Sequence, residues 1–204
     1  SRVDSLEPEV VPAGSRRRGG RREAAPVQAS SAGPEVVERD GNLVVRRADG
    51  TEVPLTTDAT PTDRATPARF VSPDGRFLVA IWQRDGEHRT VSIVEAAPEG
   101  QSQPKVHQFR YDKPGDRIDE RRPRLFDLDA GAEIPVEATL FPSPWDLSDF
   151  LWLPDSSEFL FRYNARGHRT MRVLAIAVPS GVVRTVLEDT SPTFIDWAHR
   201  SWLH

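Results

Sequence analysis

A strand–turn–strand pattern that occurs twice, 81 residues apart, constrains the fold of this 204-residue chain more than any other feature. The first copy has the turn Ser72-Pro73-Asp74-Gly75 before the apolar run from Phe77 to Trp82, and the second has Leu153-Pro154-Asp155-Ser156 before Phe159-Leu160-Phe161. Proline presets φ for such a turn, and glycine tolerates a positive φ. The same offset relates a second motif, DGTEVPL at 49–55 and AGAEIPV at 130–136. Two motifs that share one offset predict a repeated β unit.

Short apolar runs with a period of two, separated by turn residues, continue along the chain and predict strands. We expect them at residues 43–45, 52–55, 77–83, 90–95, 105–111, 124–128, 133–136, 150–153, 158–163, 170–178 and 182–187. The last four follow one another through short turns, and repeated four-stranded antiparallel units are typical of a β-propeller. A sandwich made of the same hairpins is the structural alternative. The predicted fold class is all-β, a partial β-propeller of about two to three blades with few helices.

The repeat also makes local predictions. Asp74 and Asp155 should occupy equivalent turns in successive blades. Alternate residues from Phe77 to Trp82 should differ strongly in burial, because successive side chains of a strand point to opposite faces of its sheet. Residues 56–67, which are rich in Thr, Pro and Asp, should form a loop.

Composition divides the chain into a tail and a folded part. Residues 1–35 are predicted to be disordered, since they are rich in Pro, Gly, Ala and Ser and show no apolar period, and residues 36–204 are predicted to hold the partial propeller. The tail arginines at 16–18, 21 and 22 could bind an anion or nucleic acid, but the lack of interleaved aromatic residues favours a solvated tail. The chain begins with Ser1, so a processed start and a truncation are both open, and we expect a truncated piece of a longer protein.

Charge and residue usage exclude several classes of function. A net charge of −4 with a pI near 5.8 gives no electrostatic reason to expect a nucleic-acid partner. No apolar run approaches the roughly 18 residues of a transmembrane helix. The chain has no cysteine, which excludes disulfides, a thiol nucleophile and cysteine-ligated zinc. We expect no cofactor and no metal.

The central part of the chain carries a family resemblance. After the turn at 72–75 come a glutamate-containing strand, the segment Gln103-Pro104-Lys105 and the turn Lys113-Pro114-Gly115-Asp116, which are not generic residues of a propeller blade. In these motifs the chain resembles the N-terminal propeller of the dipeptidyl peptidase IV-like serine peptidases, of the prolyl oligopeptidase clan. The resemblance continues over about residues 36–198. It implies a parent protein in which this propeller precedes an α/β-hydrolase domain, the two enclosing a cavity where short peptides are cut, typically after a penultimate Pro or Ala.

The catalytic machinery of such a peptidase is missing from this sequence. No Gly-x-Ser-x-Gly elbow occurs, and that turn needs its glycines to hold a serine hydroxyl above the sheet. The histidines lack a nucleophile and a close pair at helical spacing, so solvated or packed roles are expected for all of them. These are His88, His107, His168, His199 and His204. We predict no catalytic residue here, and the substrate-binding residues stay unknown.

One departure from the family bears on specificity. The dipeptidyl aminopeptidases of this family carry a Glu-Glu pair just before the strand that bears the SPDG turn, and this pair binds the free amino terminus of the substrate. Residues 56–67 occupy that place here, with Asp58 and Asp63 as the acids, and the chain has no Glu-Glu pair. We interpret the two aspartates as exposed loop charges. Release of dipeptides, as opposed to another peptidase specificity, is therefore in question.

Two hypotheses about function remain. In the first, the chain is the propeller part of a periplasmic or secreted serine peptidase, where it restricts access and helps bind peptides while an absent C-terminal domain does the chemistry. The parent would act on peptide substrates, and a homodimer of the parent is an assembly that the resemblance allows. In the second, the chain belongs to a non-catalytic propeller that serves as a binding module. The central motifs favour the first.

Overall fold

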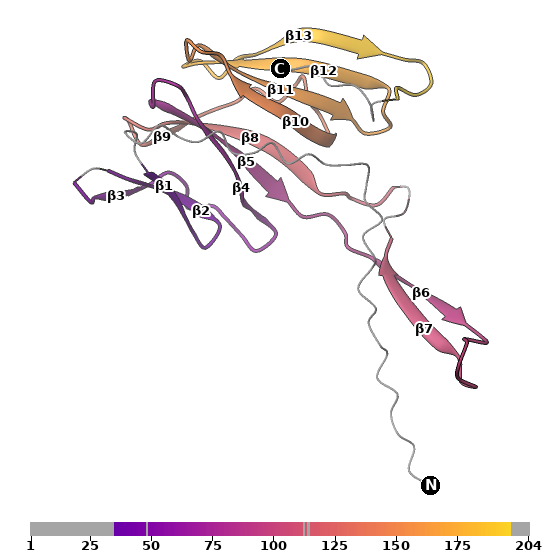
Figure 1. Ribbon diagram of the computed structural model, residues 1–204. Coiled ribbons are helices and arrows are strands. Elements are labelled where there is room, and N and C mark those ends of the chain that lie inside the picture. Colours follow the sequence, from indigo (N-terminus) through magenta and orange to yellow (C-terminus); the bar gives the residue numbers. More distant parts are fainter. Residues whose placement is uncertain (1–34, 48, 112, 114, 197–204) are drawn as a thin grey trace. The chain divides into compact units, whose positions relative to one another are not determined.

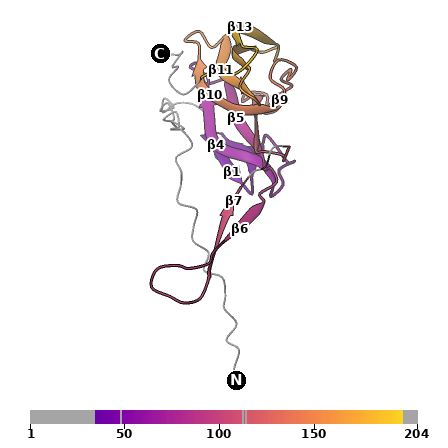
Figure 2. The same ribbon diagram turned by 90° about the vertical axis from the view of Figure 1, so that its right-hand side faces the viewer.

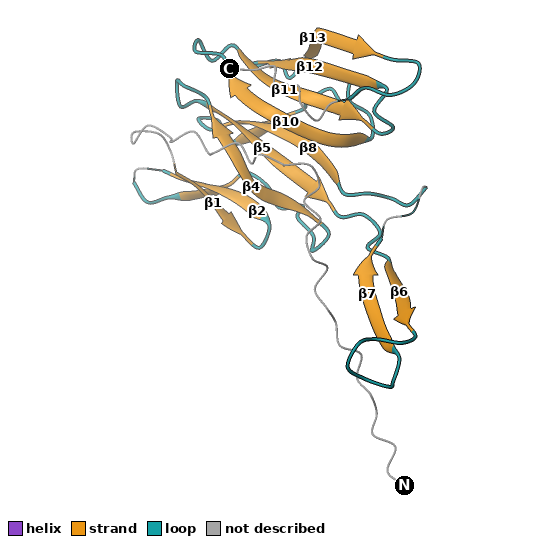
Figure 3. Ribbon diagram, turned by 45° about the vertical axis from the view of Figure 1, so that its right-hand side comes forward, coloured by secondary structure: helices purple, strands orange, loops and turns teal. Residues whose placement is uncertain are grey.

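The computed structural model describes residues 35–47, 49–111, 113 and 115–196. The described residues form strands, turns and loops and contain no helix, as the sequence predicts (Figure 3). The strands are β1 (Glu35–Arg39), β2 (Asn42–Arg46), β3 (Glu52–Pro54), β4 (Asp63–Val71), β5 (Phe77–Arg84), β6 (Thr90–Glu95), β7 (Lys105–Arg110), β8 (Glu120–Asp127), β9 (Ala132–Ile134), β10 (Pro144–Trp152), β11 (Glu158–Ala165), β12 (Thr170–Ala177) and β13 (Val183–Thr190). The tail predicted for residues 1–35 lies outside the described residues apart from Glu35, which begins β1. No helix that could span a membrane is found in the described part of the chain.

The chain divides into two compact units. The described part of the larger unit comprises residues up to Asp85 and from Asp119 onward, and the smaller unit contains residues 86–118. The larger unit holds three antiparallel sheets, in the orders β1-β2-β3, β4-β5-β8-β9 and β10-β11-β12-β13 (Figure 1). The smaller unit holds the antiparallel ribbon β6-β7, which Figure 2 shows as two strands joined by a wide loop. None of the four sheets closes on itself, and the arrangement is that of a partial β-propeller.

The repeated turns are equivalent, as predicted. The Asp74 carboxylate accepts a hydrogen bond from the Arg76 N–H at 3.1 Å, and the Asp155 carboxylate accepts one from the Ser157 N–H at 3.0 Å. The residue after each aspartate has a positive φ, 77° at Gly75 and 60° at Ser156. Both turns therefore use the aspartate side chain to hold a tight reversal between the first two strands of a four-stranded sheet.

The prediction that one face of β5 is much more buried than the other is wrong. Every residue from Phe77 to Trp82 is buried, because the sheet that contains β5 lies between the other two sheets of the larger unit. The face that carries Val79 packs against the β10–β13 sheet, and the face that carries Trp82 packs against the β1–β3 sheet. The first core includes Phe77, Val79, Ile81, Leu125, Phe159, Phe161, Leu174 and Ile176. The second includes Leu43, Val45, Leu78, Ala80, Trp82 and Phe126.

The loop predicted for residues 56–67 is also partly wrong, because β4 begins at Asp63. Pro67 lacks an N–H for a sheet ladder, and this strand tolerates it at an irregularity in the β4–β5 register between Ala65 and Arg69. The Thr66 hydroxyl donates a hydrogen bond to the Ile81 carbonyl at 2.7 Å across this irregularity. Tertiary pairing thus extends a strand through residues whose local preference is for a loop.

A buried hydrogen bond joins the two four-stranded sheets. The Trp152 indole N–H donates to the Phe70 carbonyl at 3.0 Å. The ring of Phe159 lies 5.2 Å from that of Trp152 and 5.5 Å from that of Phe70, so the bond is enclosed by aromatic groups. The Ser156 hydroxyl also accepts a hydrogen bond from the Asp74 N–H at 3.0 Å, which connects the two equivalent turns directly.

We expect Trp152→Phe to lower the free energy of unfolding by about 1–3 kcal/mol, because it leaves the buried Phe70 carbonyl without its donor and removes packed volume. Urea unfolding followed by circular dichroism measures this loss. Trp145→Phe is the matched control, since Trp145 lies in the same strand but is only partly buried. Equal losses in the two variants would contradict the role given to the indole N–H.

Candidate functional site

Residues 56–67, which follow β3 and include the start of β4, are the candidate site, because they carry the acids that stand where the resemblance implies an amine-binding pair. Asp58 lies in the loop and its side chain is 61% exposed. Its two carboxylate oxygens accept hydrogen bonds from Nη1 of Arg124 in β8, at 3.0 and 3.1 Å. The expectation of an exposed loop position is therefore confirmed for Asp58, but its carboxylate is paired with an arginine.

Arg124 is the centre of this arrangement. Its side chain is only 11% exposed, its Nε donates to Glu133 of β9 at 2.7 Å, and its guanidinium lies 4.3 Å from the centre of the Trp82 ring. Burial alone would lower the pKa of Arg124, but the hydrogen bonds that it donates to the Glu133 and Asp58 carboxylates outweigh this effect and raise the pKa. The guanidinium is thus held charged between two carboxylates and an aromatic face.

Asp63 differs from the expectation. It is the first residue of β4, and its side chain is 20% exposed, so it is not an exposed loop charge. Its carboxylate accepts hydrogen bonds from Arg84 Nε at 3.0 Å and from Arg122 Nη2 at 2.8 Å. These arginines come from the two strands that follow β4 in the sheet, so pairing of β4 with β5 and of β5 with β8 brings the three side chains together.

The two aspartates therefore tie the segment to its own sheet. A substrate ammonium would have to compete with an arginine already in hydrogen-bonding contact at each carboxylate. The arginines could not be assigned from the sequence, because Asp58 and Arg124 are 66 positions apart and meet only through the sheet. The alternation of arginines along β8, at 122 and 124, is the one local signal that the pattern offered.

We expect Arg124→Leu to lower the free energy of unfolding by about 1–3 kcal/mol, because it removes the contact with Trp82 and the pairs with Glu133 and Asp58. Chemical denaturation measures this loss. Arg76→Leu serves as the control, since Arg76 forms an exposed pair with Asp129 and should change stability by less than about 0.5 kcal/mol. If the Arg124 variant were as stable as this control, the contacts of Arg124 with Trp82, Glu133 and Asp58 would contribute nothing to the free energy of unfolding.

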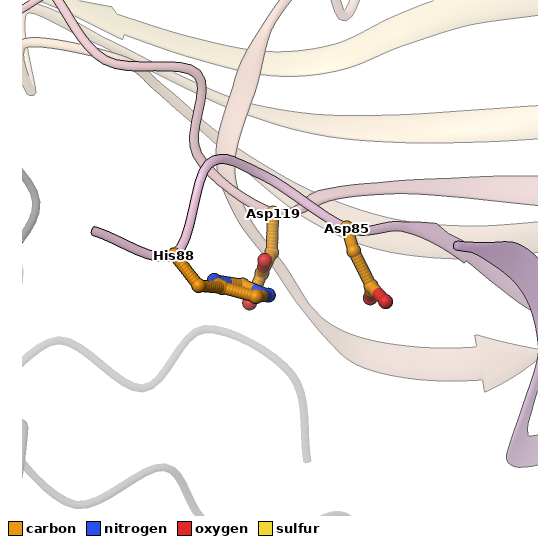
Figure 4. Close-up of side chains that lie close together, drawn as sticks. All are labelled: Asp85, His88 and Asp119. Carbon is orange, nitrogen blue, oxygen red and sulfur yellow. The ribbon is translucent and has the colours of Figure 1, made fainter. Parts of the chain in front are cut away.

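The described histidines have contacts of their own. His107 in β7 is within 2.8 Å of Glu95 through Nε2, and His168 follows β11 in a turn, where Nδ1 donates to the Asn164 side-chain oxygen at 3.2 Å. His199 and His204 lie outside the described residues. Figure 4 draws His88 with Asp85 and Asp119. His88 belongs to the smaller unit, and the two aspartates are the residues of the larger unit that directly precede and follow the smaller unit in the sequence. The absence of a metal site stays a prediction.

His168 holds the chain after β13 against the β11–β12 turn. Its ring lies edge-on between Trp145, at 5.1 Å, and Phe194, at 5.6 Å, and its carbonyl accepts a hydrogen bond from the Ile195 N–H at 2.8 Å. Burial lowers the pKa of His168 below its usual value of 6.5. The folded state therefore favours the neutral form of the His168 side chain over its protonated form.

A lowered pKa in the folded state means that His168 contributes stability above pH 6.5 and that this contribution is lost as the pH falls from 6.5 through the folded-state pKa. We expect His168→Asn to weaken the dependence of the unfolding free energy on pH between about 7.5 and 5.5, and asparagine tolerates the positive φ at this position. An unchanged slope in the His168 variant would contradict this assignment.

Comparison with known proteins places this fold in a family. The family model described as "Dipeptidyl peptidase IV (DPP IV) N-terminal region" matches residues 63–202. A dipeptidyl peptidase 4 from Porphyromonas gingivalis superposes with a TM-score of 0.59 at 16% identity, covering 84% of this chain and 26% of that one. A structure described as a dipeptidyl aminopeptidase IV from Bacteroides ovatus gives 0.58 at 15% identity, covering 82% and 24%. The chain thus spans about a quarter of the length of these structures, and a comparison with curated proteins gave no match.

Proposed function

Because its residues 63–202 match the family model, this chain belongs to the family of the dipeptidyl peptidase IV N-terminal region, and we propose that it is the N-terminal propeller part of a serine peptidase. The family match is the observation that carries the proposal. The similarity to two dipeptidyl peptidase structures agrees with it at the level of fold. The parent protein would be periplasmic or secreted and would act on peptides.

In this proposal the propeller forms a wall of the cavity that admits peptides, and a C-terminal α/β-hydrolase domain supplies the nucleophile, the base and the oxyanion donors. Acyl transfer needs these groups held together, and the present sequence has no elbow serine. The 204-residue chain alone should hydrolyse nothing. A binding module without catalysis is the competing function, and the experiment below separates the two.

The paired aspartates inform the substrate class. Asp58 contacts Arg124, and Asp63 contacts Arg84 and Arg122, so the acids of residues 56–67 are carboxylates that arginines already bind. In a site for a substrate ammonium, the cation should displace only water from the carboxylates. At Asp58 and Asp63 it would have to displace an arginine of the protein itself. We therefore propose that the parent does not depend on a free amino terminus in this segment.

The test is an assay of the full-length protein on chromogenic Xaa-Pro and Xaa-Ala dipeptides and on N-blocked tripeptides with the same cleavage site. We expect serine-dependent cleavage of both sets, with kcat/KM values within about tenfold of each other. The elbow serine changed to Ala is the control and should abolish the activity. Cleavage of free-amine substrates alone would restore dipeptide release and refute the specificity proposed here, and no serine-dependent cleavage would support the non-catalytic binding module.

A further inference from the structure

The sheet β1-β2-β3 has one strand fewer than the two sheets of the larger unit that follow it in the chain. The repeat identifies the position without a strand. The motifs at 49–55 and 130–136 place β3 at the position of β9, because Val53 corresponds to Ile134 at the offset of 81 residues. Both strands are the last of their sheets, so β2 and β1 correspond to β8 and β5. The position that β4 occupies beside β5 is therefore filled by no described residue beside β1, and we call it the open edge of β1.

The strand registers extend this equivalence to single residues. Successive pairs lead from the last strand of each sheet to corresponding residues, through Val53, Val45 and Val36 in the first sheet and through Ile134, Leu125 and Val79 in the second. Val36 and Val79 also both pack toward the sheet that follows their own. Val79 has a further partner, Phe70 of β4. A strand at the open edge of β1 would thus place one residue opposite Val36, as Phe70 lies opposite Val79.

The backbone of β1 directs hydrogen-bonding groups toward the open edge. The Val36 carbonyl accepts a hydrogen bond from Nη1 of Arg69 in β4 at 3.3 Å, so it points away from β2. Directions alternate along each strand of an antiparallel ladder, and the N–H and C=O groups of Glu38 therefore point the same way as those of Val36. A carbonyl can accept a second hydrogen bond, so the bond from Arg69 leaves the Val36 carbonyl available to another donor.

Arg69 borders the open edge of β1 and carries a donor without an acceptor. Its side chain is 23% exposed, and its Nη2 contacts a carboxylate oxygen of Glu38 at 3.3 Å. Its Nε is buried and has no hydrogen-bond acceptor among the described residues. Buried donors are rarely left in this state, because each one has lost its hydrogen bond to water. The side chain that borders the open edge therefore needs an acceptor that the described chain does not supply.

We propose that the open edge of β1 binds an extended peptide, which pairs antiparallel with β1 and completes a four-stranded sheet. Peptides that bind sheet edges do so through main-chain hydrogen bonds, and side-chain contacts add selectivity. Val36 and Glu38 would form up to about four backbone hydrogen bonds with the peptide, and a peptide carbonyl would accept a hydrogen bond from Arg69 Nε. The peptide residue opposite Val36 would face the second core, against which Val36, Val53 and Val71 pack, and should be apolar.

The peptide as ligand rests on the proposed function, because a parent that acts on peptides brings them to the propeller. The first strands of the two four-stranded sheets approach each other directly, since Trp152 in β10 donates a hydrogen bond to the Phe70 carbonyl in β4. The sheets of a propeller surround a central channel, and first strands that converge in this way lie beside it. The open edge of β1 corresponds to a first strand, so it faces the channel that would admit the peptide.

The test titrates the isotope-labelled 204-residue chain with the blocked peptide acetyl-Thr-Val-Phe-Val-Thr-amide and follows the chain by NMR. We expect saturable shifts of the Val36 and Glu38 amide signals, because both N–H groups would gain an acceptor. Blocked ends keep the charges of a free amino or carboxyl terminus out of the measurement. Unchanged signals, as expected if another part of the chain or a second copy closes this edge, would overturn the proposal.

Two variants test the contacts. Arg69→Lys keeps the positive charge but removes the Nε donor, so the dissociation constant of the peptide should rise about tenfold or more. Arg39→Lys is the matched control, since Arg39 lies in the same strand but forms an exposed pair with Glu52 at 3.3 Å, and it should change the constant by less than about twofold. Val36→Pro removes an N–H at the open edge and no bond to β2, and should also weaken binding about tenfold or more. Equal affinities of the Arg69 and Arg39 variants, or unaltered binding by Val36→Pro, would contradict the proposed pairing.

The peptide site and the proposed peptidase function can fail separately. Binding of the blocked peptide needs no hydrolase domain, so a failure at β1 would leave serine-dependent cleavage by the full-length parent untouched. Saturable binding at Val36 together with no serine-dependent cleavage would refute the peptidase and support the peptide site. In a parent that cleaves peptides, Arg69→Lys should raise KM about tenfold for a long blocked peptide and leave KM for the N-blocked tripeptides unchanged. Equal changes in the two KM values would contradict a role of β1 in holding the extended peptide.

Discussion

The stability of the larger unit depends on the sheet β4-β5-β8-β9, which is buried on both of its faces. Phe77, Val79 and Ile81 pack toward the β10–β13 sheet, and Leu78, Ala80 and Trp82 pack toward the β1–β3 sheet. A sheet with two apolar faces cannot leave either of them in water without losing the hydrophobic contribution of several large side chains. The three sheets therefore stabilise one another, as neighbouring units do in repeat architectures.

Arginine–carboxylate pairs hold the polar residues around the start of β4, which the hydrophobic cores do not include. Arg124 of β8 binds Asp58 before β4, and arginines of β5 and β8 bind Asp63 at the start of β4, so residues 56–67 are held by this sheet. In a peptidase propeller such a segment would be a rigid part of the cavity wall. Its acids are bound by arginines of the sheet, and this pairing is the basis of the specificity proposed above.

Local signals in the sequence were sufficient to predict the repeat and most of the strands, but not β1 or β4. The turns at Asp74 and Asp155 are set by their own proline and aspartate, and most strand positions follow from alternation. The extent of β4 and the burial of both faces of β5 could not be predicted, because they depend on sheets formed by distant residues. The partners of Asp58 and Asp63 could not be predicted for the same reason. Neither could the hydrogen bond of the Trp152 indole N–H, whose acceptor lies 82 positions away.

Hydrogen exchange of the Trp152 indole N–H, followed by NMR with Trp152→Phe to assign the signal, tests most directly whether the two four-stranded sheets form one core. This proton is buried between the sheets in its bond to the Phe70 carbonyl. If the sheets unfold together, it should exchange with the same free energy as the amide protons of β5 and β11, equal to that of global unfolding. Fast exchange of the indole while the amides of both sheets stay protected would contradict a shared core.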